Sequence, residues 1–343
     1  MKKYIINSTS VLLFTVLIIS CKKTEIAQPD DFAVNTIKTT YRVGDTTVFN
    51  FTGKADQIVF FSGEAGKAYA NASRIVEAGS PKLVFQTNMT QGNLPSNDSL
   101  RLYVSTNLKG YDSANVVNAT WTDITTRNTK WPTTLSTNFI ISDSIGLTDF
   151  NTADSINIAF RATGKKYATA AQRKWQMQNL TLTNFLNDGS ATPLFSTFTN
   201  TGFVQANIKN NPLPNLLVAN TNFQAWNVGE NGINANNTTT VVFGKACNSN
   251  GVAIQTAYPL SFDPSSAVNI DENDDWLITS AINLKRVKPD VGAVIKNALA
   301  LTLVNYNYKF TKAGIYNITF VAQNNNLDIQ KQVIRQMQIT VTP

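Results

Sequence analysis

Apolar and polar residues alternate with a period of two along several short runs of this chain, and this alternation constrains the fold more than any other feature of the sequence. The clearest runs are residues 100–105, 156–161, 316–320 and 337–341. A two-residue period places alternate side chains on opposite faces of a β-strand. Clusters of Thr, Asn, Ser and Gly separate the runs at the intervals typical of β-sandwiches. We therefore expect an all-β chain.

Two stretches resemble pieces of immunoglobulin-like sandwich domains. Residues 41–53 give a Gly turn followed by a strand, and residues 306–324 give a strand, a Gly turn and a second strand. The second stretch is similar to the closing strands of polycystic-kidney-disease-type (PKD-like) domains. Between them, residues 82–184 resemble the jelly roll of galactose-binding-like domains. These likenesses imply immunoglobulin/PKD-like sandwich modules flanking a galactose-binding-like jelly roll.

The likenesses divide the chain into three folded segments. We expect an immunoglobulin-like segment at residues 32–75, a jelly roll at 76–245 and an immunoglobulin/PKD-like domain at 246–343. The first segment contains too few strands to close a sandwich. An alternative is that the N- and C-terminal segments form one discontinuous domain into which the jelly roll is inserted, which requires contacts between residues 48–51 and 315–321.

The N-terminus has the layout of a bacterial secretory signal peptide with a lipoprotein cleavage box. Two lysines precede an apolar run at residues 11–19, and the box is Ile18-Ile19-Ser20-Cys21. The run is shorter than the roughly 20 apolar residues that span a bilayer. We expect residues 1–20 to be removed, Cys21 to carry the lipid that attaches the protein to a membrane, and residues 21–31 to form a tether.

The absence of histidine removes several mechanisms. Ser-His-Asp and Cys-His catalysis are excluded, as are His-ligated zinc and haem. Cys247 is the only cysteine besides Cys21, so an acylated mature chain cannot form an internal disulfide. A carbohydrate-active hydrolase needs only two carboxylates and remains a weaker alternative.

The charge pattern argues against a nucleic-acid partner. The formal net charge is +7, with 29 Lys and Arg against 22 Asp and Glu. The basic residues are scattered singly among polar residues, whereas nucleic-acid binders gather them in a stripe or on one helix.

An acidic cluster directly before Trp276 is a candidate cation site. Residues 271–275 hold four carboxylates and an amide. Calcium takes about six to eight oxygen ligands, so Asp271, Asp274 and Asp275 are candidate ligands of a structural calcium ion. The spacing is not that of a calcium-binding helix-loop-helix, and a solvated acidic turn is the alternative. We expect no other cofactor.

Tryptophan residues are the candidate platforms for a sugar, because an indole ring stacks on the apolar face of a pyranose. Trp131 lies between Lys130 and Pro132 in a polar segment, which favours exposure. Trp175 alternates in phase with Met177 and is expected in the core. We therefore assign sugar binding to Trp131, with packing in a sandwich as the alternative.

A more specific likeness lies in residues 58–74, which contain Phe61-Ser62-Gly63-Glu64-x-Gly66-x-x-Tyr69. This motif, after a Gly44-Asp45 strand in a lipoprotein, resembles the domain-of-unknown-function 5017 family of Bacteroidetes lipoproteins. Residues 274–278 and 289–297 also look familial, and Ala65 stands where proline is expected. Within the motif loop, Glu64, Tyr69 and Arg74 could recognise a polar ligand, although a tight turn needs the same groups to satisfy its backbone.

The resemblance implies a neighbour of starch-utilisation-type outer-membrane transport systems. Its expected partners are a polysaccharide or oligosaccharide, or the transporter proteins themselves. The expected location is the outer membrane, lipid-anchored, with the cell surface favoured over the periplasmic face. The family supplies no catalytic residues to carry over. We therefore expect a membrane-anchored, non-catalytic lipoprotein that binds a glycan or another polymer, with a structural or adhesive surface protein as the alternative.

Overall fold

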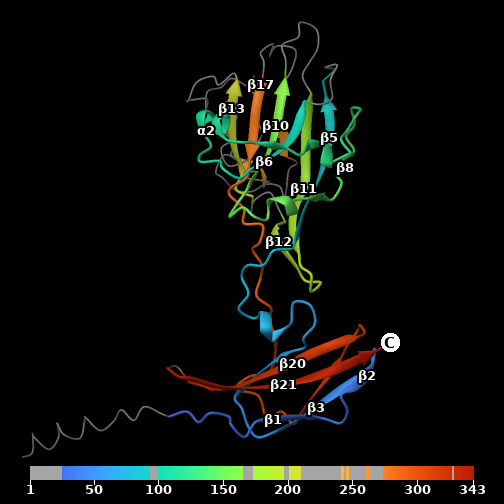
Figure 1. Cartoon of the computed structure of the whole chain (residues 1–343), viewed down its shortest axis with the longest axis vertical. Helices are drawn as coiled ribbons and strands as arrows, with labels where there is room; N and C mark the ends of the chain where they lie inside the picture. Colours follow the sequence, from blue (N-terminus) through green and yellow to red (C-terminus); the bar gives the residue numbers. More distant parts are fainter. Residues whose placement is uncertain are drawn as a thin grey trace, which may run out of the picture. The chain divides into compact units, whose positions relative to one another are not determined.

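The computed structural model describes residues 25–92, 99–164, 173–196, 201–209, 241–242, 245–246, 260–262, 273–326 and 328–343. Strands dominate these residues, which confirms the all-β prediction (Figure 1). In this described part of the chain, no helix has both the length and the apolar character needed to cross a membrane. The chain divides into unit 1, which comprises Met1–Ser73 and Asp290–Pro343, and unit 2, which comprises Arg74–Pro289.

Unit 1 is made of two sheets. The three-stranded sheet has the order β1 (Ala33–Thr36), β3 (Thr46–Thr52), β19 (Asn305–Lys309). The five-stranded sheet has the order β18 (Ala293–Lys296), β4 (Gln57–Phe61), β20 (Gly314–Asn325), β21 (Gln330–Thr342), β2 (Thr40–Arg42). The β2–β21 pair is parallel and the other pairs are antiparallel.

Phenylalanine residues from both sheets form the core of unit 1. The ring centroid of Phe49 on β3 lies 5.2 Å from that of Phe320 on β20, and 5.7 Å from that of Phe60 on β4. All three side chains are buried, because the two-residue period directs them to the same side of their strands. The two sheets of unit 1 are therefore packed face to face.

The strand pairing makes unit 1 discontinuous in sequence. Strands β3 and β4, which precede unit 2 in the chain, pair with β19 and β20, which follow it. The contacts that the discontinuous alternative requires are also present, because the ring centroids of Phe49 and Phe51 lie 5.2 and 5.4 Å from that of Phe320. The second crossing between units lies at Pro289 and Asp290, rather than at the expected 245–246 boundary. The segment 246–289 belongs to unit 2, because β17 (Asn273–Ile278) pairs there with two of its strands.

The described part of the expected tether is attached to unit 1. Asn324 Nδ2 donates to Ala27 O at 3.0 Å, and Arg335 Nη2 donates to Asp30 O at 3.0 Å. Residues 27–30 are therefore held against β20 and β21 by hydrogen bonds. Cys21 and the signal peptide lie outside the described residues.

Unit 2 contains two larger sheets and a short pair of strands, β14 (Val241–Val242) and β15 (Lys245–Ala246). The five-stranded sheet has the order β13 (Val204–Lys209), β17, β10 (Asn157–Gly164), β6 (Leu100–Ser105), β7 (Thr122–Asp123). The six-stranded sheet has the order β12 (Ala191–Phe195), β11 (Lys174–Phe185), β5 (Ser80–Gln91), β8 (Ile140–Ile141), with β16 (Leu260–Phe262) paired to β11 and β9 (Ile145–Gly146) paired to β5.

The main core of unit 2 draws on both of these sheets. Phe85 on β5 packs edge-on against Phe160 on β10, with ring centroids 5.1 Å apart. Trp175 on β11 is fully buried in the same cluster, as its phase with Met177 predicts. The inward-facing side chains of the two sheets therefore pack against each other in one core. Whether the two units are an immunoglobulin/PKD-like sandwich and a jelly roll stays a prediction.

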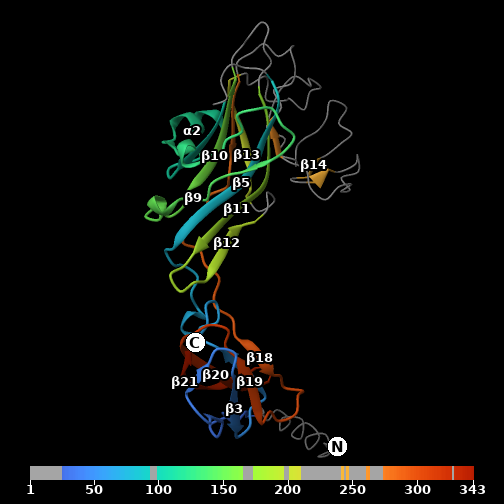
Figure 2. The ribbon, with the colours of Figure 1, turned by 90° about the vertical axis from the view of Figure 1, so that its right-hand side faces the viewer.

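The outer face of the five-stranded sheet carries a second apolar cluster. Along β10, Phe160 points to the main core while its neighbours Ala159 and Arg161 point outward. The helix α2 (Ser113–Asn118) lies beside this sheet (Figure 2). It packs on the outer face through Val116, which is buried against Trp276 and its neighbours. Asp112 caps the helix by accepting from Asn115 N at 3.0 Å. The helix leaves part of the sheet uncovered, and the candidate site lies there.

Candidate ligand-binding site

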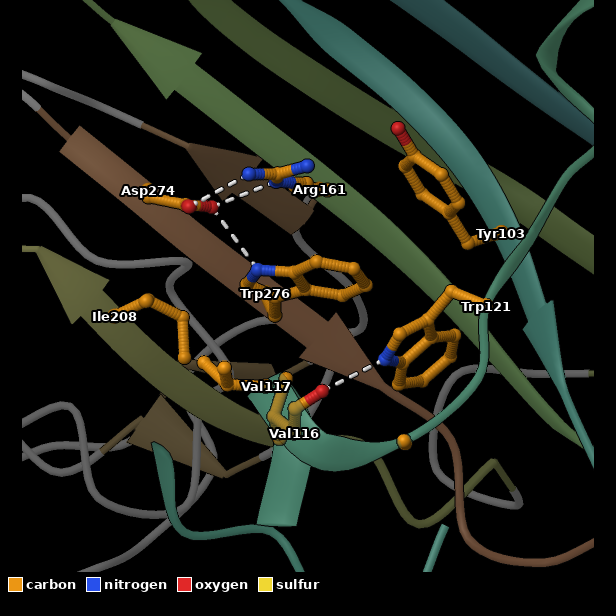
Figure 3. Close-up of a pocket in the computed structure, with 9 residues that line it drawn as sticks. Tyr103, Val116, Val117, Trp121, Arg161, Ile208, Asp274 and Trp276 are labelled. Atoms are coloured by element: carbon orange, nitrogen blue, oxygen red, sulfur yellow. Dashed lines mark hydrogen bonds and ion pairs between the residues drawn. The ribbon is translucent and has the colours of Figure 1, made fainter. Parts of the chain in front are cut away.

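A pocket of about 290 Å³ lies on the outer face of the five-stranded sheet of unit 2, beside α2 (Figure 3). Its walls combine aromatic, aliphatic and charged side chains. The lining residues are Tyr103, Val116, Val117, Ala119, Trp121, Arg161, Ile208, Asp274 and Trp276. We call this group the outer-face pocket.

Strand register brings the polar and aromatic members together. Arg161 on β10 is paired directly with Trp276 on β17, and Asp274 lies two residues from Trp276 on the same face. Directly opposed and diagonal residues of an antiparallel pair are within contact distance. Tyr103 joins them from β6, where it is paired with Ala159.

An ion pair with two hydrogen bonds forms the polar end of the pocket. Arg161 Nε donates to Asp274 Oδ1 and Arg161 Nη2 donates to Asp274 Oδ2, each at 2.7 Å. Trp276 Nε1 also donates to Asp274 Oδ1, at 2.9 Å. This bidentate contact with Asp274 raises the pKa of Arg161. The pair is therefore a fixed, charge-compensated group rather than two mobile charges.

Three aromatic rings form the apolar wall. The ring of Trp276 lies 4.8 Å from that of Trp121 and 5.3 Å from that of Tyr103, measured between centroids. Trp276 and Tyr103 are buried, and Trp121 is half-buried. Trp121 Nε1 donates to Val116 O at 2.9 Å, which ties the segment after α2 to the helix. The rings are thus held in place before any ligand binds.

This arrangement can hold a small ligand that has both an apolar face and hydroxyl groups. Pockets for small molecules occupy about 300–1,000 Å³, so the volume suits a ligand at the small end of that range. Aromatic walls offer stacking. Asp274 oxygens accept hydrogen bonds and Arg161 donates them, while their opposite charges cancel.

Trp131 is placed against the main core of unit 2 rather than standing clear of the surface. Its ring centroid lies 5.6 Å from that of Phe85, and its Nε1 donates to Thr125 O at 3.0 Å. Thr125 belongs to the 3-10 turn Thr125–Arg127. The side chain is half-buried. Trp131 is not among the residues that line the outer-face pocket. Sugar binding by Trp131 stays a prediction.

The motif-loop residues are distributed between the units. In unit 1, Glu64 Oε2 accepts from Ser62 Oγ at 2.8 Å and from Tyr308 Oη, and the ring of Tyr69, in the 3-10 turn Tyr69–Asn71, contacts that of Phe61. Burial, and secondarily the hydrogen bond to Glu64, raises the pKa of Tyr308. These contacts satisfy a tight turn, which matches the structural alternative for this loop.

Arg74 has partners of its own in unit 2. Its Nη1 donates to Glu77 Oε2 at 2.6 Å and to Asp188 Oδ2 at 2.9 Å. Both partners belong to unit 2, and a ligand role for Glu64, Tyr69 and Arg74 stays a prediction.

Two of the three expected calcium ligands, Asp274 and Asp275, lie in a strand. Asp274 and Asp275 are consecutive residues of β17, so their side chains point to opposite faces of the sheet. Asp274 is engaged by Arg161. Asp271 lies outside the described residues, and those that are described contain no group of three or more His, Cys, Asp or Glu that could hold a metal ion. A structural calcium ion stays an expectation.

One feature of the sequence is consistent with the outer-face pocket, although its residues also belong to the acidic cluster. Asp274 and Trp276 are in phase, as Arg161 and Ala159 are, so in a strand the members of each pair lie on the same face. The residues that close the pocket, Trp121 and Val116, come from a separate segment. Only the fold brings them to β17.

One comparison with known proteins gives a match. A family model described as Domain of unknown function (DUF5017) matches residues 20–203, more than half of the chain. The matched range includes the motif loop and the pocket residues Tyr103, Trp121 and Arg161. No curated protein and no solved structure matches the chain.

Proposed function

Because this chain belongs to the domain-of-unknown-function 5017 family, whose description names no activity, we propose a function from the site itself. The protein is a non-catalytic lipoprotein, anchored to the outer membrane through Cys21, that binds a glycan in the outer-face pocket. The observation that carries the proposal is the fixed Arg161–Asp274 pair beside the rings of Trp121 and Trp276. The lipoprotein box supports the anchor.

The chemistry of a sugar matches both halves of the pocket. A pyranose ring has an apolar face of C–H groups that packs against an indole, and hydroxyl groups at its edge that donate and accept. Trp121 is the half-buried ring of the wall, so it is the one available for stacking. Asp274 and Arg161 lie where the hydroxyl groups would be hydrogen-bonded.

The charge balance of the pocket favours a neutral sugar. Arg161 is held by both of its hydrogen bonds to Asp274, so an acidic sugar would have to compete with a carboxylate that is already in place. Breaking a largely buried ion pair leaves one charge uncompensated, which is costly. We therefore assign neutral glycans rather than uronic acids or sialic acids to this site.

A binding role also agrees with the carboxylates of the pocket. Glycoside hydrolysis uses two carboxyl groups on either side of the scissile bond, about 5 to 10 Å apart. Among the described residues that line the outer-face pocket, Asp274 is the single carboxylate, and it is occupied by Arg161. Asp275 points to the other face of β17.

Glycan arrays followed by calorimetry with the lipidated protein in detergent test the proposal. Trp121→Ala should weaken binding of a neutral glycan by about 1–3 kcal/mol, as loss of a central aromatic contact does. Trp131→Ala is the matched control, because it removes an indole of the same unit that packs on the core. It should lower the melting temperature and leave the affinity unchanged.

Three results would count against the proposal. Failure of the wild-type protein to bind any glycan would exclude glycan recognition. Loss of affinity in Trp131→Ala with retention in Trp121→Ala would move the site to Trp131. Retention of a protein partner from solubilised membranes in place of any glycan would favour the adhesive alternative.

A further inference from the structure

The segment between β18 and β19, residues 297–304, exposes large apolar side chains on unit 1. Leu299 is 99% exposed, Leu301 is 92% exposed and Val304 is 65% exposed. The segment Asn-Ala-Leu-Ala-Leu-Thr-Leu-Val contains no charged residue. Figure 2 shows it projecting from unit 1 between the labels β18 and β19. Clustered exposed apolar side chains of this kind mark an interaction surface.

The segment has a defined conformation that keeps these side chains outward. Ala300 N donates to Asn297 O and Leu299 N donates to Asn297 Oδ1, each at 3.1 Å. At the other end, Phe51 N donates to Val304 O at 2.9 Å, and Leu303 packs on the core of unit 1. Leu303 is therefore half-buried against the core, while Leu299 and Leu301 face outward.

The same region of unit 1 holds the chain that leads to the lipid. Ala298 and Ala300 line a pocket of about 260 Å³ together with Asn324. Asn324 Nδ2 donates to Ala27 O at 3.0 Å. Ala27 lies six positions after Cys21, and six residues of extended chain span at most about 20 Å. A membrane that holds a lipid on Cys21 must therefore lie close to this side of unit 1.

We propose that residues 297–304 form a membrane-docking loop, in which Leu299 and Leu301 enter the interfacial region of the bilayer that holds the lipid anchor. Apolar side chains bind this region, and lysines beside them stay at the level of the headgroups. Exposed Lys54, on the rim of the adjoining pocket, supplies such a cation. The inference rests on the proposed anchor and is independent of the glycan pocket. Its consequence is that unit 1 has a fixed orientation on the membrane.

A fluorophore that responds to its surroundings tests the loop in the lipidated full chain. The variants are Leu301→Cys and, as control, Ile315→Cys, both made with Cys247→Ser so that one thiol is free. Ile315 is also exposed, at 66%. It lies nine residues from Asn324 along β20, a separation of about 30 Å in a strand. Each labelled protein is reconstituted on phosphatidylcholine and phosphatidylglycerol vesicles with and without nitroxide-labelled lipid.

The label in Leu301→Cys should shift to shorter wavelength on vesicles and be quenched by the nitroxide lipid, whereas the label in Ile315→Cys should do neither. Equal behaviour of the two labels would overturn the docking loop. A shift of the Leu301→Cys label before vesicles are added would assign the loop to a second copy of the chain. Failure of the protein to float with vesicles would overturn the anchor, and the docking loop with it, while leaving glycan binding intact.

Discussion

At the scale of single residues, strand β17 places two adjacent carboxyl groups in opposite situations. Asp274 is hydrogen-bonded by Arg161 and Trp276 on the outer face. Asp275 is 2% exposed on the inner face, and this burial, with the neighbouring charge of Asp274, raises its pKa well above the ordinary value of 3.8. A buried carboxyl group favours its neutral form. Ionisation of Asp275 must therefore oppose folding.

Asp275→Asn should consequently change how stability depends on pH. The raised pKa means that the native state binds the proton more tightly than the unfolded state, so the contribution of Asp275 to stability is complete below about pH 3.8 and is lost as pH rises through the native pKa. Asparagine has no such loss. The unfolding free energy of Asp275→Asn, relative to wild type, should therefore increase from pH 4 upward in urea titrations.

Asp143→Asn is the control with the opposite sign. Hydrogen bonds from Thr129, with Lys130 adding to them, lower the pKa of Asp143 to about 2. Asp143 therefore contributes stability above pH 3.8 that is lost as pH falls towards 2. Asp143→Asn should therefore reduce the pH dependence of the unfolding free energy below pH 3.8 and leave it unchanged at higher pH. Parallel pH curves for wild type and both variants would contradict the assigned environments.

At the scale of elements, the motif loop after β4 is held by glycines that differ in their surroundings. Gly63 and Gly66 both have positive φ, 75° and 77°. A Cβ on Gly63 would lie 2.7 Å from Asn317 O of β20, whereas a Cβ on Gly66 would meet no atom within 4 Å. The first glycine permits a close approach of two chain segments, and the second only relieves backbone strain.

Gly63→Ala should therefore destabilise unit 1 more than Gly66→Ala does. The left-handed backbone alone costs an alanine about 1–2 kcal/mol, which is the whole expected loss at Gly66. At Gly63 the clash with β20 adds to that loss, because the contact is with backbone that cannot move aside. Chemical unfolding followed by circular dichroism measures both. Equal losses would mean that the approach to Asn317 contributes nothing.

The elements also show how far the sequence alone could lead. The alternation at residues 100–105 and 156–161 located β6 and β10, because one face of each is buried in the main core. The same alternation made Tyr103 and Arg161 look solvent-facing. Their role depends on α2 and on β17, which pairs with β10 from more than 100 residues away. Local periodicity reports that a strand has two faces, but it does not report what covers the second face.

The strand position of Asp274 and Asp275 is not predictable from the sequence for a related reason. Carboxylates are rare inside strands, so residues 271–275 favoured a turn or a cation site. The structure places Asp274 and Asp275 within β17. Asp274 is tolerated there because Arg161 is its register-diagonal partner. That partner is fixed by tertiary pairing, which no local pattern contains.

At the scale of the whole molecule, unit 2 is a continuous segment inserted into a discontinuous unit 1. The two ends of unit 2 are held together by its own backbone: Glu77 N donates to Lys285 O at 2.7 Å, and Val287 N donates to Ile75 O at 3.0 Å. Folded unit 2 therefore delivers the two segments of unit 1 close to each other. If unit 2 unfolds, those segments are joined by a long flexible loop, and closing such a loop costs entropy.

The stabilities of the two units should therefore be coupled, and by linkage the coupling free energy is the same in both directions. Trp175→Ala removes a fully buried side chain from the core of unit 2 and should cost about 3–5 kcal/mol. Once unit 2 melts first, unit 1 should melt at a lower temperature as well. Phe320→Ala makes a comparable cavity in the core of unit 1. When unit 1 melts first in that variant, unit 2 should lose the loop-closure contribution and nothing more, because its own core is unchanged.

The chain supplies its own probe for this coupling. All five tryptophans fall within Arg74–Pro289, so tryptophan fluorescence reports the unfolding of unit 2 alone, while calorimetry reports both units. In Phe320→Ala, calorimetry should show the transition of unit 1 moved to lower temperature, while the fluorescence transition moves at most by the loop-closure contribution. In Trp175→Ala both should move. A fluorescence transition that shifts equally in the two variants would mean that the units unfold as one cooperative structure, because destabilising either core would then destabilise the whole.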